Sequence, residues 1–462
     1  MLSSVVRFFY PNIEPSEVKK FSLFGMACFF TLGTYWILRL LKDLLIYQLS
    51  FPVELGWANN YGTEFIPTMK LISWGTIFLA VFVYSRLVDK YKKQQLFYVI
   101  GAFYIAIFVL LGVVLFLNHT HGVHAFSWFT FAPWLPMAAA GVIGYLATES
   151  FGSLMIALFW SFTISVMTGD EAKRAFPFII ALTQIGTITA SLMVKFQLPG
   201  WALLAICTGS ICAVFFFIGR IVKILTPEQL EDRGEKKAKP DVLAGLKLLA
   251  TKPYLMGVFV VSTFYEIAKT IVDYQMKSQA RFLPGVNFQD FIGTYGVWTN
   301  SLALLMALFG TSVIMKRMGL RFCLILYPAM FGAAMTGLYF FYLSGPNPGT
   351  LLDATFYVMM LVTATSYAVN NPTKEMMYIP TSKDAKFKTK GFIDMAGNRS
   401  AKGAGAVINT NLVVPKNYAA SLQNLMLYGS LIGLGIIGLW IMAAIYVGKK
   451  NTQLVKDGEI IE

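Results

Sequence analysis

Long apolar segments separated by polar connections run along the whole chain. A segment of about 20 mainly apolar residues is long enough to cross the hydrocarbon core of a bilayer as a helix. This length criterion predicts about twelve transmembrane helices in two sets of about six. The predicted helices span residues 21–46, 65–84, 95–117, 139–168, 175–195, 201–224, 254–276, 290–315, 321–343, 351–371, 391–414 and 424–447.

The eleventh segment, 391–414, belongs to an unusually polar stretch at residues 370–405. This stretch combines lysines with glycines and prolines between two strongly apolar segments. Cationic groups beside small residues are what a phosphate-bearing solute needs. The residues that interrupt the eleventh segment itself are Asp394, Asn398, Arg399 and Lys402.

A polar connector at residues 226–252 divides the chain into two near-equal halves. Its charge and proline content predict a cytoplasmic linker with one short amphipathic helix. We therefore predict an N-terminal six-helix bundle at 1–225, the linker at 226–252, and a C-terminal six-helix bundle with a cytoplasmic tail at 253–462. This pattern indicates an all-α integral membrane protein of the major facilitator architecture, with its substrate between the halves near the midplane.

Composition supports the membrane class. Apolar residues make up 56% of the 462-residue chain and charged residues only 13%, and the mean hydropathy is +0.61. The formal charge of +14 indicates contact with a lipid bilayer and anionic solutes rather than with nucleic acid, because no nucleic-acid-binding module accompanies it. The four cysteines lie in apolar runs without metal-ligand spacing, so we expect each to be a small buried apolar residue.

Positive charge in short connections predicts the orientation, since Lys and Arg are retained on the cytoplasmic side. The connections at 48–64 and 118–138 contain no Lys or Arg, so both termini should be cytoplasmic. The N-terminus resembles neither a signal nor a transit peptide, which favours a bacterial inner membrane. The basic residues behind this orientation are Arg86, Lys90, Lys92, Lys93, Lys173, Arg174, Lys449, Lys450 and Lys456, with Lys277 and Arg281 as the exception in an outer connection.

The basic connection at residues 85–93 is similar to the loop between helices 2 and 3 of major facilitators. In that loop an aspartate and basic residues form a latch on the inner side. Arg86 and Asp89 are therefore the candidate gating residues.

Ionisable side chains inside spanning helices are the main candidates for a binding site. Each costs about 2.5 to 3.5 kcal/mol on insertion scales, so such groups persist where they meet water, a partner or a solute. The first helix carries one charged stripe and the seventh carries another, and we expect the two stripes to face one cavity. The alternative is that each stripe is only an internal salt bridge near a helix end. The residues of the stripes are Arg39, Lys42 and Asp43, and Glu266, Lys269 and Asp273.

Three further charged positions extend this set. Lys70 either lines the cavity or snorkels to the outer headgroups, whereas Glu149 lies in a long apolar helix with no such escape. Lys374 follows Asn371 and Pro372, where we expect the helix to break and expose backbone groups to a cavity.

The sequence gives no indication of a metal site or of ATP hydrolysis. His119, His121 and His124 lie in an external connection without carboxylate or cysteine partners, so a plain loop is the simpler interpretation. No G-x-x-x-x-G-K-[ST] motif is present, so nothing in the sequence indicates ATP hydrolysis or a cofactor.

Three short segments in the polar stretch have distinctive sequences, namely Pro372 to Pro380, Lys390 to Asp394, and Asn398 to Gly403. These segments closely resemble motifs of the ATP/ADP translocases, nucleotide transporters of plastids and obligate intracellular bacteria. Earlier segments are similar as well, and the resemblance spans nearly the whole chain. These segments contain Arg39, Lys42 and Asp43, then Glu64, Ile66, Pro67 and Lys70, then Glu149, Gly152, Ser153, Phe159 and Trp160.

The resemblance implies a nucleotide transporter in which residues matching Lys70, Glu149, Glu266 and Lys374 act in transport. The chain departs from the family pattern around Glu149, where Thr148 to Phe151 replaces the usual Ala-Glu-Leu-Trp. Changed neighbours of this kind bear on selection of the base or ribose. The resemblance therefore predicts exchange of ATP for ADP across the membrane by alternating access. NAD/ADP antiport and proton-coupled nucleotide import, which also occur on this architecture, are the alternatives.

The chain could also belong to two other classes of protein, a membrane-embedded enzyme or a structural or receptor-like protein. A membrane-embedded enzyme acting on a phosphate compound would need a nucleophile or metal cluster, and the helices contain no such constellation. A structural or receptor-like protein would tolerate alanine at Glu149 without any effect on solute uptake.

Overall fold

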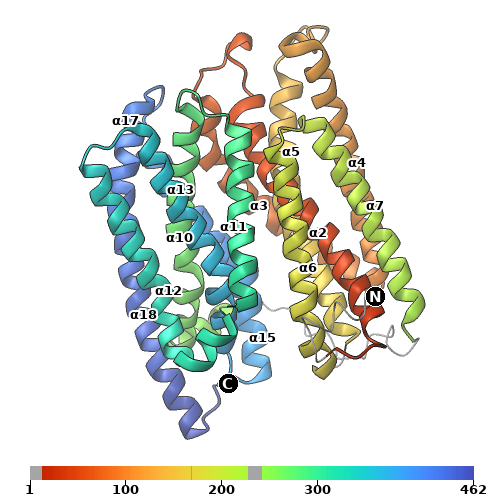
Figure 1. The fold of residues 1–462 in the computed structure, drawn as a ribbon, viewed down its shortest axis with the longest axis vertical. Coiled ribbons are helices and arrows are strands. Elements are labelled where there is room, and N and C mark those ends of the chain that lie inside the picture. The colour runs from red at the N-terminus through yellow and green to blue at the C-terminus, as the bar shows by residue number, and fades with distance from the viewer. Residues whose placement is uncertain (1–12, 168, 227–241, 310, 462) are drawn as a thin grey trace. The chain divides into compact units, whose positions relative to one another are not determined.

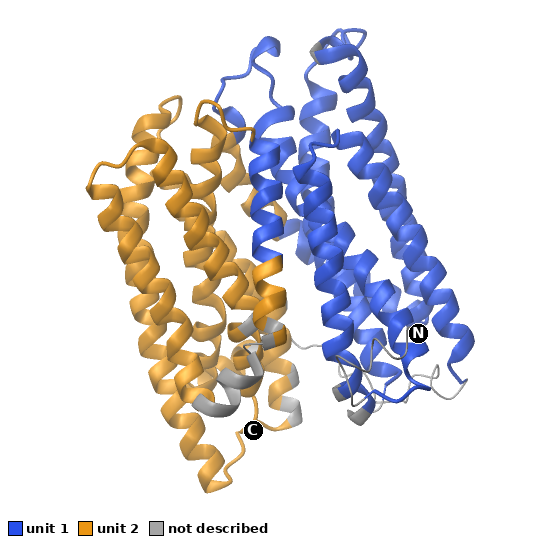
Figure 2. Ribbon diagram, viewed as in Figure 1, with its two compact units in different colours: residues 1–62, 75–236, 288–300 blue, residues 63–74, 237–287, 301–462 orange. Residues whose placement is uncertain are grey.

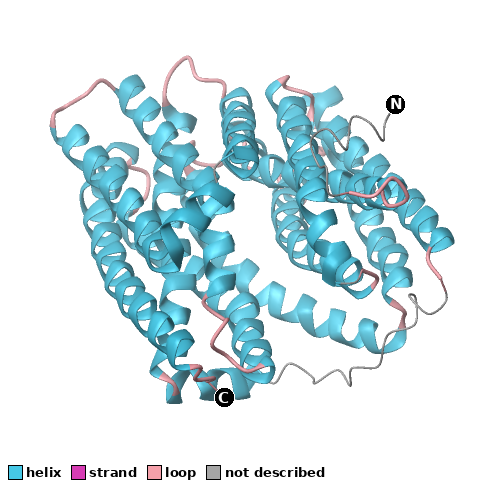
Figure 3. Cartoon of the chain, turned by 60° about the horizontal axis from the view of Figure 1, so that its bottom comes forward, coloured by secondary structure: helices cyan, strands magenta, loops and turns pink. Residues whose placement is uncertain are grey.

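Helices make up the regular structure of a computed structural model that describes residues 13–167, 169–226, 242–309 and 311–461 (Figure 1). The view coloured by secondary structure shows no strand among these residues (Figure 3). One isolated bridge pairs Thr381 with Ile461. The predicted all-α membrane fold is confirmed.

The chain forms two compact units (Figure 2). The first comprises residues 1–62, 75–236 and 288–300, and the second comprises residues 63–74, 237–287 and 301–462. The start of helix α3 thus belongs to the second unit and the start of α11 to the first. The predicted boundaries at 225 and 253 stay a prediction.

Long apolar helices build the first unit. They are long because each must satisfy its backbone hydrogen bonds internally within a bilayer. The unit contains α2 (Val18–Leu44), η1 (Leu45–Leu49), η2 (Val53–Leu55), most of α3 (Tyr61–Lys90), α4 (Lys93–His121), η3 (Gly122–His124), α5 (Leu135–Ser165), α6 (Gly169–Lys195), α7 (Gly200–Ile224) and the start of α11 (Phe288–Phe309).

The second unit has more interrupted helices. The short helix α9 (Val242–Thr251) lies within the predicted linker, of which residues 227–241 lie outside the described residues. The unit continues with α10 (Pro253–Phe282), the end of α11, α12 (Thr311–Leu343), α13 (Pro348–Thr365), η4 (Ser366–Asn370), α14 (Asn371–Met376), α15 (Lys383–Phe392), η5 (Ile393–Gly397), α16 (Asn398–Leu412), α17 (Tyr418–Asn424), η6 (Leu425–Gly429) and α18 (Ser430–Asp457).

Within the described residues, nine helices are long and apolar enough to cross a membrane. The count of twelve spans stays a prediction. One predicted end was too early. Helix α10 runs to Phe282 rather than ending at residue 276. Helix α11 is described up to Phe309, and residues 311–318 after the undescribed residue 310 are also helical, so the predicted end near residue 315 stays a prediction. A backbone break at Gly319, with φ of 72°, then separates a short segment from the long helix that follows.

The predicted helix break before Lys374 is wrong. The backbone stays helical through Asn370 and Asn371. It widens into the π-helical turn η4, and Pro372 follows in the first turn of α14. Proline lacks an N–H, and a wider turn accommodates the missing hydrogen bond without ending the helix.

One cysteine also departs from its prediction. Cys28, Cys207 and Cys323 are buried, but Cys212 is exposed. Its position within an apolar helix did not reveal which face it occupies, and a bilayer-spanning helix is apolar on its outer face too.

Helices α2 and α6 of the first unit pack closely at Gly186. A Cβ atom added there would lie 2.6 Å from the carbonyl oxygen of Phe29. A backbone atom cannot yield as a side chain can, so we expect Gly186→Ala to lower stability by about 1–3 kcal/mol. Thermal unfolding of the purified protein in detergent measures this loss.

Gly209→Ala on α7 is the matched control, because a Cβ atom there meets nothing within 4 Å. This variant should keep or slightly raise the unfolding temperature, since alanine favours helix more than glycine does. Equal unfolding temperatures for Gly186→Ala and the wild type would contradict the close packing of α2 on α6.

Candidate functional site

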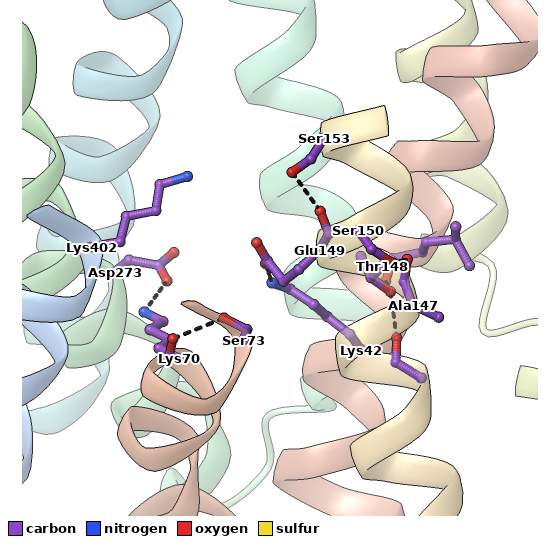
Figure 4. A network of polar contacts seen from close by, with 12 residues as sticks. Lys42, Lys70, Ser73, Ala147, Thr148, Glu149, Ser150, Ser153, Asp273 and Lys402 are labelled. Atoms are coloured by element: carbon purple, nitrogen blue, oxygen red, sulfur yellow. Dashed lines mark hydrogen bonds and ion pairs between the residues drawn. The ribbon is translucent and has the colours of Figure 1, made fainter. Parts of the chain in front are cut away.

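A buried ion pair links α2 and α5 in the first unit. The Lys42 amino group donates to a carboxylate oxygen of Glu149 (Figure 4). Only 10% of the Lys42 side chain and 16% of the Glu149 side chain are exposed. The Lys42 nitrogen also lies 4.3 Å from the centre of the Tyr145 ring. The Lys42 amino group is thereby held between a carboxylate and an aromatic face.

Close helix packing positions this pair. The Thr148 hydroxyl lies 3.3 Å from the carbonyl oxygen of Leu38 on α2. A Cβ atom at Gly152 would lie 2.4 Å from the Tyr35 ring, so glycine lets α5 approach α2 there. The backbone on both sides of Glu149 therefore rests against α2.

The other charged residues of the first stripe flank this pair along α2. The Arg39 guanidinium lies 4.8 Å from the centre of the Trp36 ring. Asp43 is buried, with 4% of its surface exposed. Together with Lys42 they give α2 two cations and one anion within little more than one turn.

A second cluster surrounds Tyr265 on α10 in the second unit. The Lys269 amino group donates to the Tyr265 hydroxyl over 2.7 Å. The Lys374 nitrogen lies 5.1 Å from the centre of the same ring and donates to the carbonyl oxygen of Ser262 over 2.9 Å. Glu266 faces Lys402 of α16 across 3.8 Å. Three lysines and one glutamate thus make the cluster positively charged.

A third cluster lies further along α10 in the same unit. Asp273 contacts Lys277 at 2.9 Å and Lys70 of α3 at 3.8 Å. Figure 4 shows the Lys70 and Asp273 side chains directed at each other. Lys70 thus contacts a carboxylate on α10, and whether it lines a cavity stays a prediction.

Ion pairs between helices also argue against internal salt bridges as the whole explanation of the two stripes. Lys42, Glu266 and Asp273 each contact a partner on another helix. That the two stripes face one cavity stays a prediction.

The remaining predicted residues lie outside these three charged clusters. Asn371 is exposed at the start of α14. The Arg86 guanidinium lies 5.1 Å from the Phe82 ring centre, and the Asp89 side chain lies outside the described residues. His119 and His121 are exposed in the last turn of α4 rather than in a loop. No metal-binding group of three His, Cys, Asp or Glu residues occurs in the part of the chain that the structure describes.

An ion-paired junction joins the beginnings of α2 and α6. The Arg174 guanidinium donates to both carboxylate oxygens of Glu17, over 2.5 and 3.1 Å. These hydrogen bonds lower the pKa of Glu17. Lys20 pairs with Glu171 at 2.7 Å nearby. Part of the basic charge that predicts the orientation is therefore neutralised locally.

Sequence reasoning missed Lys277, Lys402 and the two aromatic partners. Lys277 was placed in a connection between helices, although its i,i+4 spacing from Asp273 indicates a pair on one helical face. Lys402 was noted only as an interruption of a span. Tyr145 and Tyr265 each lie one turn before a charged residue that was identified, and the same spacing would have found them.

The fold is that of major-facilitator-type membrane transporters. The structure is similar to a bacterial homologue of the iron transporter ferroportin in its inward-facing state, with a TM-score of 0.61 and 13% identity over 94% of this chain and 100% of that one. It is also similar to the nucleoside transporter NupG, with a TM-score of 0.57 and 12% identity over 93% and 99% of the two chains.

The sequence narrows the class to one family. Residues 1–451 match the family described as TLC ATP/ADP transporter, and the chain belongs to that family. It is therefore a multi-pass membrane transporter and not an enzyme. The resemblance predicted from the motifs is confirmed.

Curated relatives extend across bacteria and plastids. ADP,ATP carrier protein 2, chloroplastic, of Arabidopsis thaliana is 27% identical over 97% of this chain and 77% of its own length. ADP,ATP carrier protein 1 of Chlamydia pneumoniae is 27% identical over 96% and 93%. ADP,ATP carrier protein 1 of Rickettsia prowazekii is 24% identical over 99% and 98%.

Proposed function

We propose that this protein exchanges ATP for ADP across a bacterial inner membrane by alternating access, with both termini in the cytoplasm. Membership of the TLC ATP/ADP transporter family carries the proposal. The clusters of lysines paired with carboxylates inside apolar helices support it, since a chain of phosphates needs several cations that are already held in place.

The side chains divide into three roles. The cations bind phosphate oxygens, the carboxylates hold the cations in register and contact base or ribose, and a latch on the inner side closes between steps. The proposed phosphate-binding residues are Arg39, Lys42, Lys70, Lys269 and Lys374. The proposed register and contact residues are Asp43, Glu149, Glu266, Asp273 and Asn371, and the proposed latch is Arg86 with Asp89.

Exchange follows from the cost of buried charge. The nucleotide supplies phosphate oxygens that compete for the lysines in each ion pair. Reorientation passes through a closed state in which the buried charges are costly until the phosphates of a nucleotide share in neutralising them, so the empty carrier reorients poorly. Transport in one direction then requires a counter-substrate on the other side.

Uptake of labelled ATP by proteoliposomes tests the proposal. Vesicles loaded with ADP should take up ATP rapidly, and empty vesicles should take up little. Added protonophore should leave the rate unchanged.

Three other results would redirect the assignment. Uptake into empty vesicles that stops with protonophore would identify proton-coupled import, and exchange of NAD in preference to ATP would identify NAD/ADP antiport. Folded protein that carries no nucleotide under any of these conditions overturns the proposal.

A further inference from the structure

Three buried aromatic rings from different helices pack together in the second unit. Helices α10, α12 and α18 lie side by side there (Figure 1). The ring centre of Tyr265 on α10 lies 6.1 Å from that of Trp440 on α18 and 5.7 Å from that of Tyr327 on α12. The ring centres of Tyr327 and Trp440 are 5.5 Å apart. Each ring therefore contacts the other two, and we call these three residues the aromatic triad.

Tyr265 also contacts two of the proposed phosphate-binding lysines. The Lys269 amino group donates to its hydroxyl over 2.7 Å and lies 5.2 Å from its ring centre. The Lys374 nitrogen lies 5.1 Å from the same ring centre. The position of this one ring therefore affects where both amino groups lie.

The packing of the triad leaves the Tyr265 ring little room to move. The exposed fractions are 0% for Trp440, 1% for Tyr327 and 3% for Tyr265. The Tyr327 hydroxyl donates to the carbonyl oxygen of Val362 over 2.9 Å, which fixes that ring against α13. Protein interiors are close-packed, so a smaller side chain in place of Trp440 would leave space into which the Tyr265 ring can turn.

Stability alone does not explain a tryptophan at this position. The indole N–H of Trp440 is buried and has no hydrogen-bond partner within the described ranges of the chain. A buried donor without an acceptor is destabilising, and leucine or phenylalanine would occupy the interior without one. The indole differs from those side chains in its larger flat surface, which holds a neighbouring ring in place.

We propose that Trp440 is a positioning residue for nucleotide binding, which holds the Tyr265 ring so that Lys269 and Lys374 are placed to meet phosphate oxygens. The inference rests on the proposed nucleotide exchange and adds to it a residue that does not itself touch the nucleotide. Misplacement of a binding group by about 1 Å can cost up to about 100-fold in rate. Loosening the Tyr265 ring should therefore weaken the use of ATP without removing any charge.

Exchange kinetics in ADP-loaded proteoliposomes test this role. Trp440→Leu should raise the KM for ATP by about 10-fold, because the two lysines are no longer held where phosphates bind. The maximal rate per folded molecule should change by less than about threefold, as expected when binding is lost uniformly. Trp440→Phe keeps an aromatic ring and should recover most of the affinity. Trp440→Met fills the space with a flexible side chain and should raise the KM in the same way if Trp440→Leu does not fold.

Phe97→Leu is the matched control for loss of a buried aromatic ring. Phe97 is 0% exposed and belongs to another group of packed rings, in the first unit. Its ring centre lies 5.7 Å from that of Phe162, which lies 5.9 Å from that of Phe24. The variant should lower the unfolding temperature, as Trp440→Leu does, and leave the KM for ATP unchanged.

A double variant shows whether Trp440 acts through Tyr265. Tyr265→Leu alone removes the ring that both lysines contact and should raise the KM at least as much as Trp440→Leu does. Trp440→Leu added to Tyr265→Leu should raise the KM no further, because effects that pass through a shared contact are not additive. Two independent packing defects would instead multiply.

The outcomes separate the two proposals. Wild-type protein that exchanges no nucleotide overturns the proposed function and this inference with it. Wild-type exchange together with an unchanged KM in Trp440→Leu overturns only the role of Trp440. The same conclusion follows from an equal rise in KM in Phe97→Leu, from no recovery in Trp440→Phe, or from KM increases that multiply in the double variant.

Discussion

Glu149→Gln should reduce ATP/ADP exchange by up to about 100-fold, because a charge-assisted contact worth up to about 3 kcal/mol is lost and each 1.4 kcal/mol is a factor of ten. The substitution keeps the shape of the side chain and removes its charge. Lys42 then stays little exposed beside the Tyr145 ring without its carboxylate. Counter-substrate exchange in proteoliposomes, normalised to folded protein, measures the loss.

The double variant Lys42→Gln/Glu149→Gln distinguishes a transport role from a folding role. Removing one partner of a buried pair is more damaging than removing both, since no uncompensated charge is left. The double variant should recover the unfolding temperature that Glu149→Gln loses, yet exchange should stay low. Recovery of both properties together would assign the pair to folding alone.

A matched control lies one residue away on α5. Ser150 accepts a hydrogen bond from the Tyr104 hydroxyl over 2.9 Å within the unit. Ser150→Ala removes a neutral contact of similar burial and should cost about 1 kcal/mol of stability. Exchange per folded molecule should change little. A loss as large as that of Glu149→Gln would mean that any change on this part of α5 stops transport.

The helical membrane fold was predictable from the sequence because bilayer thickness imposes one length on every span. Apolar composition marks where a helix lies in lipid, however, and not where its hydrogen bonding ends. Helix α10 continues for about one and a half turns beyond the predicted end. Lys277 looked like the first residue of a loop, but it lies on the same face of α10 as Asp273 and is paired with it.

The charged residues of the site were predictable one by one, since each is costly in an apolar helix. Their partners were not. Lys42 and Glu149 are 107 positions apart in the sequence, and hydropathy contains no information on which helices meet. Lys70 pairs with α10 of the other half of the sequence. Pairing of this kind depends on how helices pack, which the residue pattern of one helix does not determine.

The backbone near Lys374 shows that residue propensities alone do not predict where a helix ends. Asn-Asn-Pro predicts a helix end by ordinary propensity. The structure keeps the helix and inserts a π-helical turn instead. A π-helical turn shifts the residues that follow it around the helix axis, and such turns are frequent at functional sites. The deviation therefore changes the direction of Lys374 rather than exposing backbone.

Lys374→Gln should also reduce exchange by about 10-fold to 100-fold, the range expected for one contact to a charged group. The acceptor of the Lys374 amino group is a neutral carbonyl oxygen, that of Ser262, at 2.9 Å. This contact orients the lysine, and the carboxylates of Glu266 and Asp394 also interact with its charge. We expect phosphate oxygens to compete with these carboxylates for Lys374. Lys374→Arg should retain part of the activity, with the loss seen mainly as a raised KM for ATP.

Lys386→Gln is the control for Lys374→Gln, because Lys386 lies on the neighbouring helix α15 with its nitrogen 5.9 Å from the Tyr378 ring centre. It removes the same charge from the same polar stretch and should leave exchange unchanged. Tyr265→Phe adds a further distinction. It removes the hydroxyl that holds Lys269 and keeps the ring beneath Lys374. If Lys374 acts through its own charge, Tyr265→Phe must be milder than Lys374→Gln; an equal or greater loss would assign the effect to Lys269 and the hydroxyl instead.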